Sequence, residues 1–245
     1  MDSGELHAGK AFPIVRDQNL NLSLTENSRV KTLSKNLFPV VGIGASAGGL
    51  ESFKKLVKAI PKESGMAYIL VQHLHPDHSS SLPEILQRES SIPVQEIMNN
   101  MEVMPDNIYI IPANKMLVAN DGILQISPRP SKDQKNMPID VFFSSLADVH
   151  QSHAIGIVLS GSGIDGTIGL KNIKAHGGIT FAQDPDSAAY DAMPSSAIHA
   201  EVVDFILTPE KMPLQLLELN RKFSLLPSED IETNAKLIEN ESFNN

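Results

Sequence analysis

Hydrophobic and polar positions alternate along the chain in a pattern of strands followed by helices. The apolar run Phe38–Ile43 predicts a buried strand. Apolar residues at helical spacing follow it, so a helix is expected to begin near Gly48 and to stop before Pro61. The glycines of Gly42–Gly44 are expected to permit a tight turn between the two.

The same alternation continues to the end of the chain. The further strands expected are Ala67–Val71, Pro93–Ile97, Ile108–Ile111, Met116–Ala119, Ile123–Ile126, Ala154–Leu159, Ile179–Ala182 and Val202–Leu207. The further helices expected are Ser80–Glu89, one opening at Pro138 with Val141, Phe142, Leu146 and Val149 inward, one ending near Ala175, and Leu214–Leu226. Asn120-Asp121-Gly122 predicts a hairpin turn.

Strands separated by helices of this length predict an α/β fold. We expect a doubly wound, mostly parallel sheet with helices on both faces, in three α/β/α layers, together with a small β-hairpin. Residues 1–37 are polar and show little periodicity, which is typical of a flexible N-terminal leader. The predicted organisation is that leader, a catalytic domain over 38–213, and a C-terminal helix with an acidic tail or linker over 214–245.

Charge and composition exclude several classes of protein. A formal net charge of −9 and the absence of a basic stripe argue against nucleic-acid binding. No apolar run approaches the ~20 residues of a membrane span, and the N-terminus lacks the pattern of a signal peptide. The chain has no cysteine, so it has no disulfide, thiol nucleophile or thiolate metal site. We therefore expect a cytoplasmic protein without membrane insertion.

Polar residues follow three of the predicted strands and together suggest acyl transfer. Ser46, His73 and Asp165 each lie just beyond a strand end, where ligands bind in parallel sheets. A serine needs a histidine to take its proton, and a carboxylate fixes the tautomer of that histidine. The backbone N–H of Ala47 would hold the oxyanion, with a second donor from the turn at Gly161–Gly163.

Each piece of this constellation also has a simpler structural interpretation. A Gly-x-Gly-x-Ser turn often only lets a helix pack closely on a strand, a histidine after a strand is commonly structural, and Asp165 is placed to be a helix N-cap. Residues 42–47 also satisfy the G-x-G-x-x-G/A dinucleotide fingerprint. That fingerprint expects an acidic residue after the second strand, where this chain has Gln72 and His73.

A metal site is the second alternative. Residues 73–78 read H-x-H-x-D-H, which resembles the zinc motif of metallo-β-lactamase-type hydrolases. The remaining histidines lie in or beside predicted helices without the pattern such a site needs, and the metal interpretation leaves Ser46 and Asp165 without a role. We therefore expect neither a metal nor a cofactor.

Longer stretches resemble a known family, in order from about Phe38 to about Pro213. They are VVGIGASAGGLESF, ILVQHLHPDH, NIYIIPANKMLV, IGIVLSGSGIDGTIGLKNIKAHGG, FAQDP and MPSSAI. Together they resemble the catalytic domain of the chemotaxis protein-glutamate methylesterases, the CheB type. The resemblance implies a serine hydrolase that demethylates glutamate γ-methyl esters on the cytoplasmic helices of chemoreceptors and also deamidates receptor glutamines.

The resemblance also implies roles for individual residues. By motif position Ser46 is the nucleophile, His73 the general base and then acid, and Asp165 its orienting carboxylate. The backbone N–H groups of Ala47 and Ser162 are the expected oxyanion donors. Ser162 stands where the family often has methionine, a change that a backbone donor tolerates.

Two further expectations concern context. Residues 1–37 cannot form the receiver domain that usually precedes this one, so phosphorylation of an attached receiver is not expected to control the chain. The segments QHLHPDH, SGSGIDGT and FFSSLA resemble those of methylesterase domains that are fused to a receptor methyltransferase. We therefore expect a fused or partner methyltransferase. The alternative function is a weakly catalytic sensory or scaffold domain of the same fold.

Overall fold

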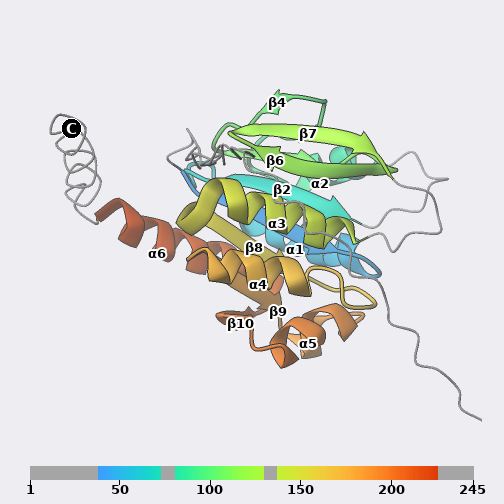
Figure 1. Cartoon of the computed structure of the whole chain (residues 1–245). Coiled ribbons are helices and arrows are strands. Elements are labelled where there is room, and N and C mark those ends of the chain that lie inside the picture. Colours follow the sequence, from blue (N-terminus) through green and yellow to red (C-terminus); the bar gives the residue numbers. More distant parts are fainter. Residues whose placement is uncertain (1–37, 73–80, 130–136, 226–245) are drawn as a thin grey trace, which may run out of the picture. The chain divides into compact units, whose positions relative to one another are not determined.

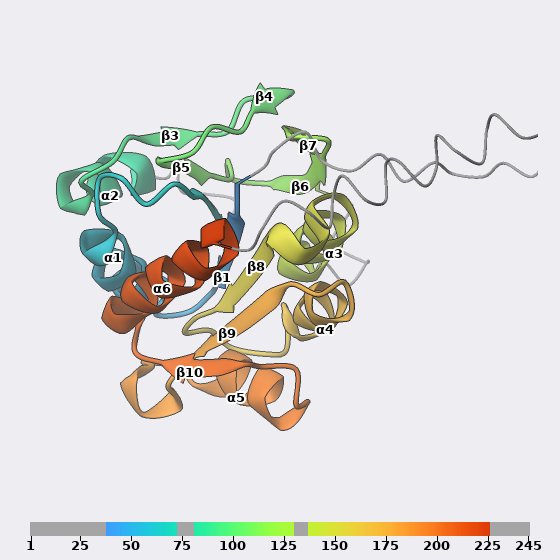
Figure 2. The ribbon, with the colours of Figure 1, turned by 90° about the vertical axis from the view of Figure 1, so that its left-hand side faces the viewer.

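The computed structural model describes residues 38–72, 81–129 and 137–225. The predicted leader and most of the acidic tail lie outside these residues. Within them, a seven-stranded parallel sheet forms the centre of the molecule (Figures 1 and 2). In spatial order its strands are β10 (Phe205–Leu207), β9 (Ile179–Gln183), β8 (Ala154–Val158), β1 (Val40–Ala45), β2 (Ala67–Gln72), β5 (Asn107–Ile110) and β3 (Val94–Glu96).

Helices cover both faces of this sheet, as Figure 2 shows. One face packs against α1 (Gly49–Ala59), α2 (Leu82–Glu89) and α6 (Met212–Leu225). The other packs against α3 (Pro138–His150), α4 (Thr167–Ala175) and α5 (Ala192–His199). Short 3₁₀ turns complete the chain at Gln151–His153, Pro185–Ser187 and Pro209–Lys211. The structure thus confirms the predicted doubly wound α/β fold and its three layers.

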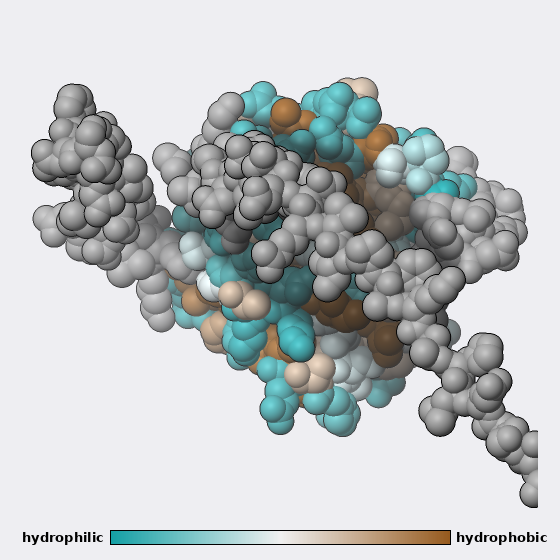
Figure 3. Space-filling model, in the orientation of Figure 1, coloured by the Kyte–Doolittle hydropathy of each residue, from teal (hydrophilic) through white to brown (hydrophobic). Residues whose placement is uncertain are grey.

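A small antiparallel sheet lies over α3 in Figure 1 and contains the predicted hairpin. Its strands are β4 (Met101–Glu102), β7 (Ile123–Pro128) and β6 (Lys115–Asn120), of which β4 was not predicted. Asp121 and Gly122 adopt φ of 43° and 79°, the left-handed values that a two-residue hairpin turn requires. Leu117 and Leu124 are buried in the core shared with α3, whereas the outer surface of the small sheet is mainly hydrophilic (Figure 3).

Gly42 and Gly44 correct one sequence expectation. Both lie inside β1 rather than in a turn, and the residue with a left-handed φ is Gly48, at 72°. A Cβ on Gly42 would lie 2.9 Å from the Phe143 ring, and one on Gly44 would overlap the Ile139 side chain. These glycines therefore let α3 pack closely on β1. The space is filled by protein, so a dinucleotide pyrophosphate has no approach to them.

Helix α3 buries a wider face than the sequence suggested. Phe142, Phe143 and Leu146 are fully buried, because α3 contacts the sheet, α4 and the small sheet. Val141 was expected to face inward but is 39% exposed. The helical spacing identified the face, but only the position of α4 shows that the face extends to Phe143.

The Ile139 side chain occupies space that two glycines leave open. A Cβ on Gly166 would lie 3.0 Å from Ile139 Cγ2, and the contact with Gly44 is closer still. We expect Gly44→Ala to lower the free energy of unfolding by about 1–3 kcal/mol, because the core would be overpacked. In an Ile139→Ala background the same change should cost clearly less, since the overlapping atoms are gone. Urea unfolding of the four proteins of this double-mutant cycle measures the coupling.

Gly42→Ala provides the matched control, because its close neighbours are Phe142, Phe143 and Leu146 rather than Ile139. Gly42→Ala should lower the free energy of unfolding by the same amount with and without Ile139→Ala. Equal coupling in both cycles would contradict the proposed contact.

His150, the last residue of α3, is buried, and burial lowers its pKa from 6.5 to about 4. The unfolded chain therefore binds this proton at higher pH than the folded chain does. Stability is lost as pH falls from about 6.5 to about 4, by up to about 3 kcal/mol for this group. We expect His150→Leu to remove this part of the acid sensitivity, measured by urea unfolding across that range. A slope in His150→Leu equal to that of the wild type would contradict this effect of burial.

Candidate active site

The candidate site lies where the strand order reverses direction at the carboxyl edge of the sheet. Strands β1 and β8 are neighbours, and the chain leaves them toward opposite edges of the sheet. Ser46 directly follows β1 and is partly exposed. Its N–H donates to the Ser160 carbonyl at 3.0 Å, and its own carbonyl accepts from Gly49 N–H at 3.0 Å. The main chain of Ser46 is therefore held between the end of β8 and the N-terminus of α1.

Ser160 connects three segments around Ser46, although the sequence did not single it out. Its buried hydroxyl donates to the Ala47 carbonyl at 2.9 Å and accepts from Tyr190 N–H at 3.0 Å. Its own N–H donates to the Gln183 side-chain oxygen at 2.9 Å. In the sequence, Ser160 and Gln183 are polar residues at the ends of apolar strands, which is the signal that could have identified them. Their hydrogen-bond partners are distant in sequence and were not predictable.

Gly161 lies directly beside the candidate nucleophile. A Cβ there would lie 3.0 Å from Ser46 Cβ and would overlap Met193 Sδ. The Gly161 N–H donates to the Tyr190 carbonyl at 2.9 Å, and its carbonyl accepts from Met193 N–H at 3.0 Å. The amide of Gly161 is therefore committed to the fold and is not an oxyanion donor.

The two predicted oxyanion donors are the amides of Ala47 and Ser162. Within the part of the chain that the structure describes, neither Ala47 N–H nor Ser162 N–H donates a hydrogen bond. Ala47 follows Ser46 at the start of α1, and Ser162 is exposed in the turn after β8. Among the described residues, no acceptor competes for these amides, as an oxyanion site requires.

Asp165 is buried, and its carboxylate caps a helix other than its own. Its Oδ1 accepts from Asp140 N–H at 2.9 Å and its Oδ2 from Ile139 N–H at 3.2 Å, both in the first turn of α3. The simpler expectation that Asp165 is the N-cap of the helix after it is wrong, because Gly166 occupies that position of α4. A carboxylate has about four lone-pair sites, so each oxygen keeps one for a further donor.

Burial also raises the pKa of Asp165 to about 6, because the charged form loses hydration. The two α3 amides act in the opposite direction, and the neighbouring carboxylate of Asp140 raises the value further. Asp165 is therefore mainly ionised at neutral pH, as an orienting carboxylate must be.

The predicted base, His73, lies outside the described residues, as does the whole H-x-H-x-D-H motif. Gln72, the residue before it, pairs in parallel register with Ala45, the residue before Ser46. Within the described ranges, no three His, Asp or Glu side chains are grouped as metal ligands. No helix there has the length and apolarity needed to cross a membrane.

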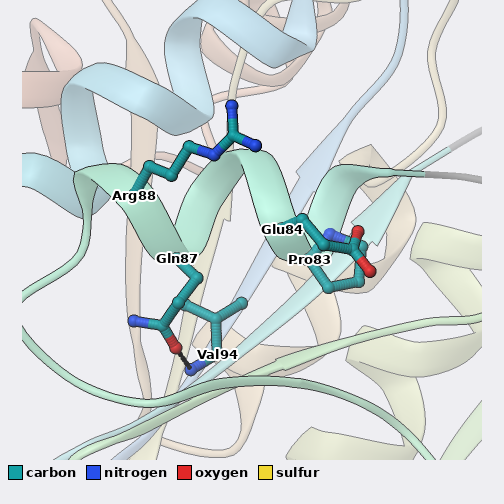
Figure 4. A pocket seen from close by; sticks show the side chains of 5 residues that line it. All are labelled: Pro83, Glu84, Gln87, Arg88 and Val94. Carbon is teal, nitrogen blue, oxygen red and sulfur yellow. Dashed lines mark hydrogen bonds between the residues drawn. The ribbon is translucent and has the colours of Figure 1, made fainter.

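A groove lies on α2 and the edge strand β3. This groove of about 370 Å³ is lined by Pro83, Glu84, Gln87, Arg88 and Val94 (Figure 4). The Gln87 side-chain oxygen accepts from Val94 N–H at 2.8 Å, which satisfies an amide of the edge strand. Among the described residues, neither Ser46 nor Asp165 lines the groove.

Comparison with known proteins identifies the family. The CheB methylesterase family model matches residues 41–216. The chain belongs to the CheB methylesterase family. The crystal structure of the Thermotoga maritima CheB methylesterase catalytic domain superposes with a TM-score of 0.69 at 31% identity, covering 74% of this chain and 98% of that domain.

Curated relatives carry the same assignment. A Leptospira interrogans relative named for both methylesterase and glutaminase activity is 31% identical over 75% of this chain and 96% of its own length. The protein-glutamate methylesterase/protein-glutamine glutaminase of Photorhabdus laumondii is 33% identical over 73% of this chain and 52% of its own length. The protein-glutamate methylesterase/protein-glutamine glutaminase 3 of Pseudomonas aeruginosa is 34% identical over 74% of this chain and 54% of its own length. The chain thus spans about half the length of the last two relatives.

These matches confirm the predicted family, the fold class and the class of enzyme, a protein-glutamate methylesterase. They do not test the individual site residues, which stay predictions.

The contacts of the Ser160 hydroxyl predict that this CheB-type domain needs it for full activity. Ser160→Ala removes the connection between Ala47 and Tyr190 and leaves Tyr190 N–H unsatisfied. We expect kcat for methyl ester hydrolysis to fall about 10-fold with little change in KM, because the Ser46 turn would shift. The free energy of unfolding should fall by about 1–2 kcal/mol. Steady-state kinetics and urea unfolding measure the two effects.

Ser90→Ala is the matched control, since the Ser90 hydroxyl also donates to a carbonyl and accepts from an amide, both of Ile92, at 2.7 and 3.1 Å. It should lose stability with kcat unchanged. If kcat of Ser160→Ala were also unchanged, the proposed role of the Ser160 hydroxyl would be wrong.

Proposed function

We propose that this domain hydrolyses glutamate γ-methyl esters of chemoreceptors with a Ser46–His73–Asp165 triad. The observation that carries the proposal is the position of Ser46, held between β1 and β8 at the point where the strand order reverses. The turn that bears Asp165 follows the same strand β8. Parallel α/β sheets bind their ligands at such a point.

The proposed reaction proceeds through an acyl-enzyme, with His73 acting first as base and then as acid. Ser46 Oγ attacks the γ-carbonyl carbon while His73 takes its proton, and the Ala47 and Ser162 amides bind the oxyanion. The tetrahedral intermediate collapses, methanol leaves with the proton from His73, and an acyl-enzyme on Ser46 remains. Water activated by His73 then releases the glutamate carboxylate. Deamidation of a receptor glutamine would follow the same steps, with ammonia as the leaving group.

Asp165 supports His73 by holding the imidazole in one tautomer and stabilising the imidazolium. Its ionised form is favoured by the amides of Ile139 and Asp140. These steps require neither a metal nor a cofactor. The proposed setting is the cytoplasm, with the methylated cytoplasmic helices of receptors as substrate and a receptor methyltransferase as a fused or separate partner.

The direct test is methanol release from methylated receptor cytoplasmic fragments in buffer with a chelator. We expect the wild type to release methanol, Ser46→Ala to release none, and Asp165→Asn to be slowed by several orders of magnitude. Full activity in Ser46→Ala would contradict the triad. Activity that the chelator abolished, with zinc in the purified protein, would favour the metal hydrolase instead.

The pairing of Ser46 with His73 can be tested without any substrate. Because the chain has no cysteine, Ser46→Cys introduces its sole thiol. A neighbouring imidazolium should lower the thiol pKa below the usual value of about 8.5, measured by alkylation rate against pH. Adding His73→Ala should return the pKa toward that value. A paired thiol together with no methanol release by the wild type would support a binding or scaffold role.

A further inference from the structure

Two buried carboxylates cap each other's helices beside the candidate site. Asp140 lies in the first turn of α3, and its Oδ1 accepts from Gly166 N–H at 2.9 Å and from Gly169 N–H at 2.7 Å, at the start of α4. Asp165, just before α4, accepts in return the N–H groups of Ile139 and Asp140. The helix N-termini of α3 and α4 are therefore joined by four hydrogen bonds through two side chains.

We propose that Asp140 is a positioning residue for methyl ester hydrolysis, acting by holding the turn that carries Asp165. The inference rests on the proposed role of Asp165 as the orienting carboxylate. Gly166 is the residue immediately after Asp165, so the bond from Gly166 N–H to Asp140 restrains the main chain beside it. The second bond, from Gly169, restrains the first turn of the helix that follows.

The packing of the two helices makes this restraint rigid. A Cβ on Gly169 would lie 3.2 Å from Asp140 Cα and would overlap Phe143 Cβ. Helices α3 and α4 thus approach each other closely at the level of Asp140. A shift of this carboxylate would move α4 and the turn before it, because the interior leaves little free volume.

Capping alone does not require a negative charge at position 140. Asp140 is buried, and its Oδ2 has no hydrogen-bond partner within the described residues. An asparagine oxygen could accept the same two amides without burying an ionised group, so the charge costs free energy that a cap does not need. A buried carboxylate with an unpaired oxygen is unfavourable for stability, and such exceptions are expected at functional sites.

The charge of Asp140 acts on Asp165 as well. Burial raises the pKa of Asp140, and the neighbouring Asp140 carboxylate in turn raises the pKa of Asp165. Among the described residues, Arg129, after β7, interacts electrostatically with Asp165. A nearby cation favours the ionised carboxylate, which is the opposite of the effect of the Asp140 charge.

The first test is the pH profile of kcat for Asp140→Asn. The asparagine keeps an acceptor for the two amides but removes the neighbouring charge, which should lower the pKa of Asp165. We expect the acid limb of the profile to move to lower pH by roughly 0.5–1 unit. A purely structural role would leave the limb where it is in the wild type.

The second test is Asp140→Ala, which removes the cap. We expect kcat to fall about 10- to 100-fold with KM nearly unchanged, because Asp165 would lose its orientation. Asp106→Asn is the matched control. The Asp106 carboxylate also accepts two backbone amides, Ser64 N–H at 2.7 Å and Gly65 N–H at 2.9 Å, but it lies at the amino-terminal edge of the sheet. Asp106→Asn keeps the acceptor and should leave kcat and the acid limb as in the wild type. Asp106→Ala, the control for loss of the cap, should lose stability with the same kcat and acid limb.

The outcomes separate this inference from the proposed function. If Asp165→Asn abolishes activity while Asp140→Asn and Asp140→Ala match Asp106→Asn in kcat and pH profile, the role of Asp140 is overturned and the triad stands. If Asp165→Asn keeps wild-type kcat, the triad is overturned, and the role of Asp140 with it. Urea unfolding of each variant shows that the assays compare folded proteins.

Discussion

The close approach of α3 to the central strands is the constraint on which the rest of the site depends. Ile139, in the first turn of α3, fills the space that Gly44 and Gly166 leave open. The N–H of the same residue donates to Asp165. A single residue thus joins hydrophobic packing against β1 and β8 to the placement of a buried carboxylate. Side chains at either glycine would move α3 outward and remove the amides that Asp165 uses.

Helix N-termini are the main source of favourable electrostatics in this region. The start of α1 follows Ser46, the start of α3 solvates Asp165, and the start of α4 solvates Asp140. Backbone N–H groups there are unsatisfied within the helix and carry partial positive charge. They stabilise the two buried carboxylates by direct hydrogen bonds. The domain can therefore hold two acidic side chains in its core despite a net charge of −9.

Local pattern predicted most elements of this fold. The strands at 38–43 and 154–159, the helix after Gly48 and the hairpin turn at Asp121-Gly122 are present within a few residues of their expected bounds. The sequence also indicated three polar positions beyond strand ends, of which Ser46 and Asp165 lie in the described residues. It did not indicate β4, the burial of Phe143, or the roles of Ser160 and Gln183. These depend on partners that are distant in the chain.

The sequence by itself determined the alternation of strands and helices, the family and the residue types available for catalysis, because these depend on local spacing and on motif identity. Only the tertiary structure decided why Gly42 and Gly44 are glycines. It also showed which helix Asp165 caps and that Asp140 lies opposite it. Each of these facts is a contact between segments about 25 to 100 residues apart. Such contacts follow from the packing of α3 and α4 on one face of the sheet, where hydrophobic volume must be filled and every buried carboxylate must find donors.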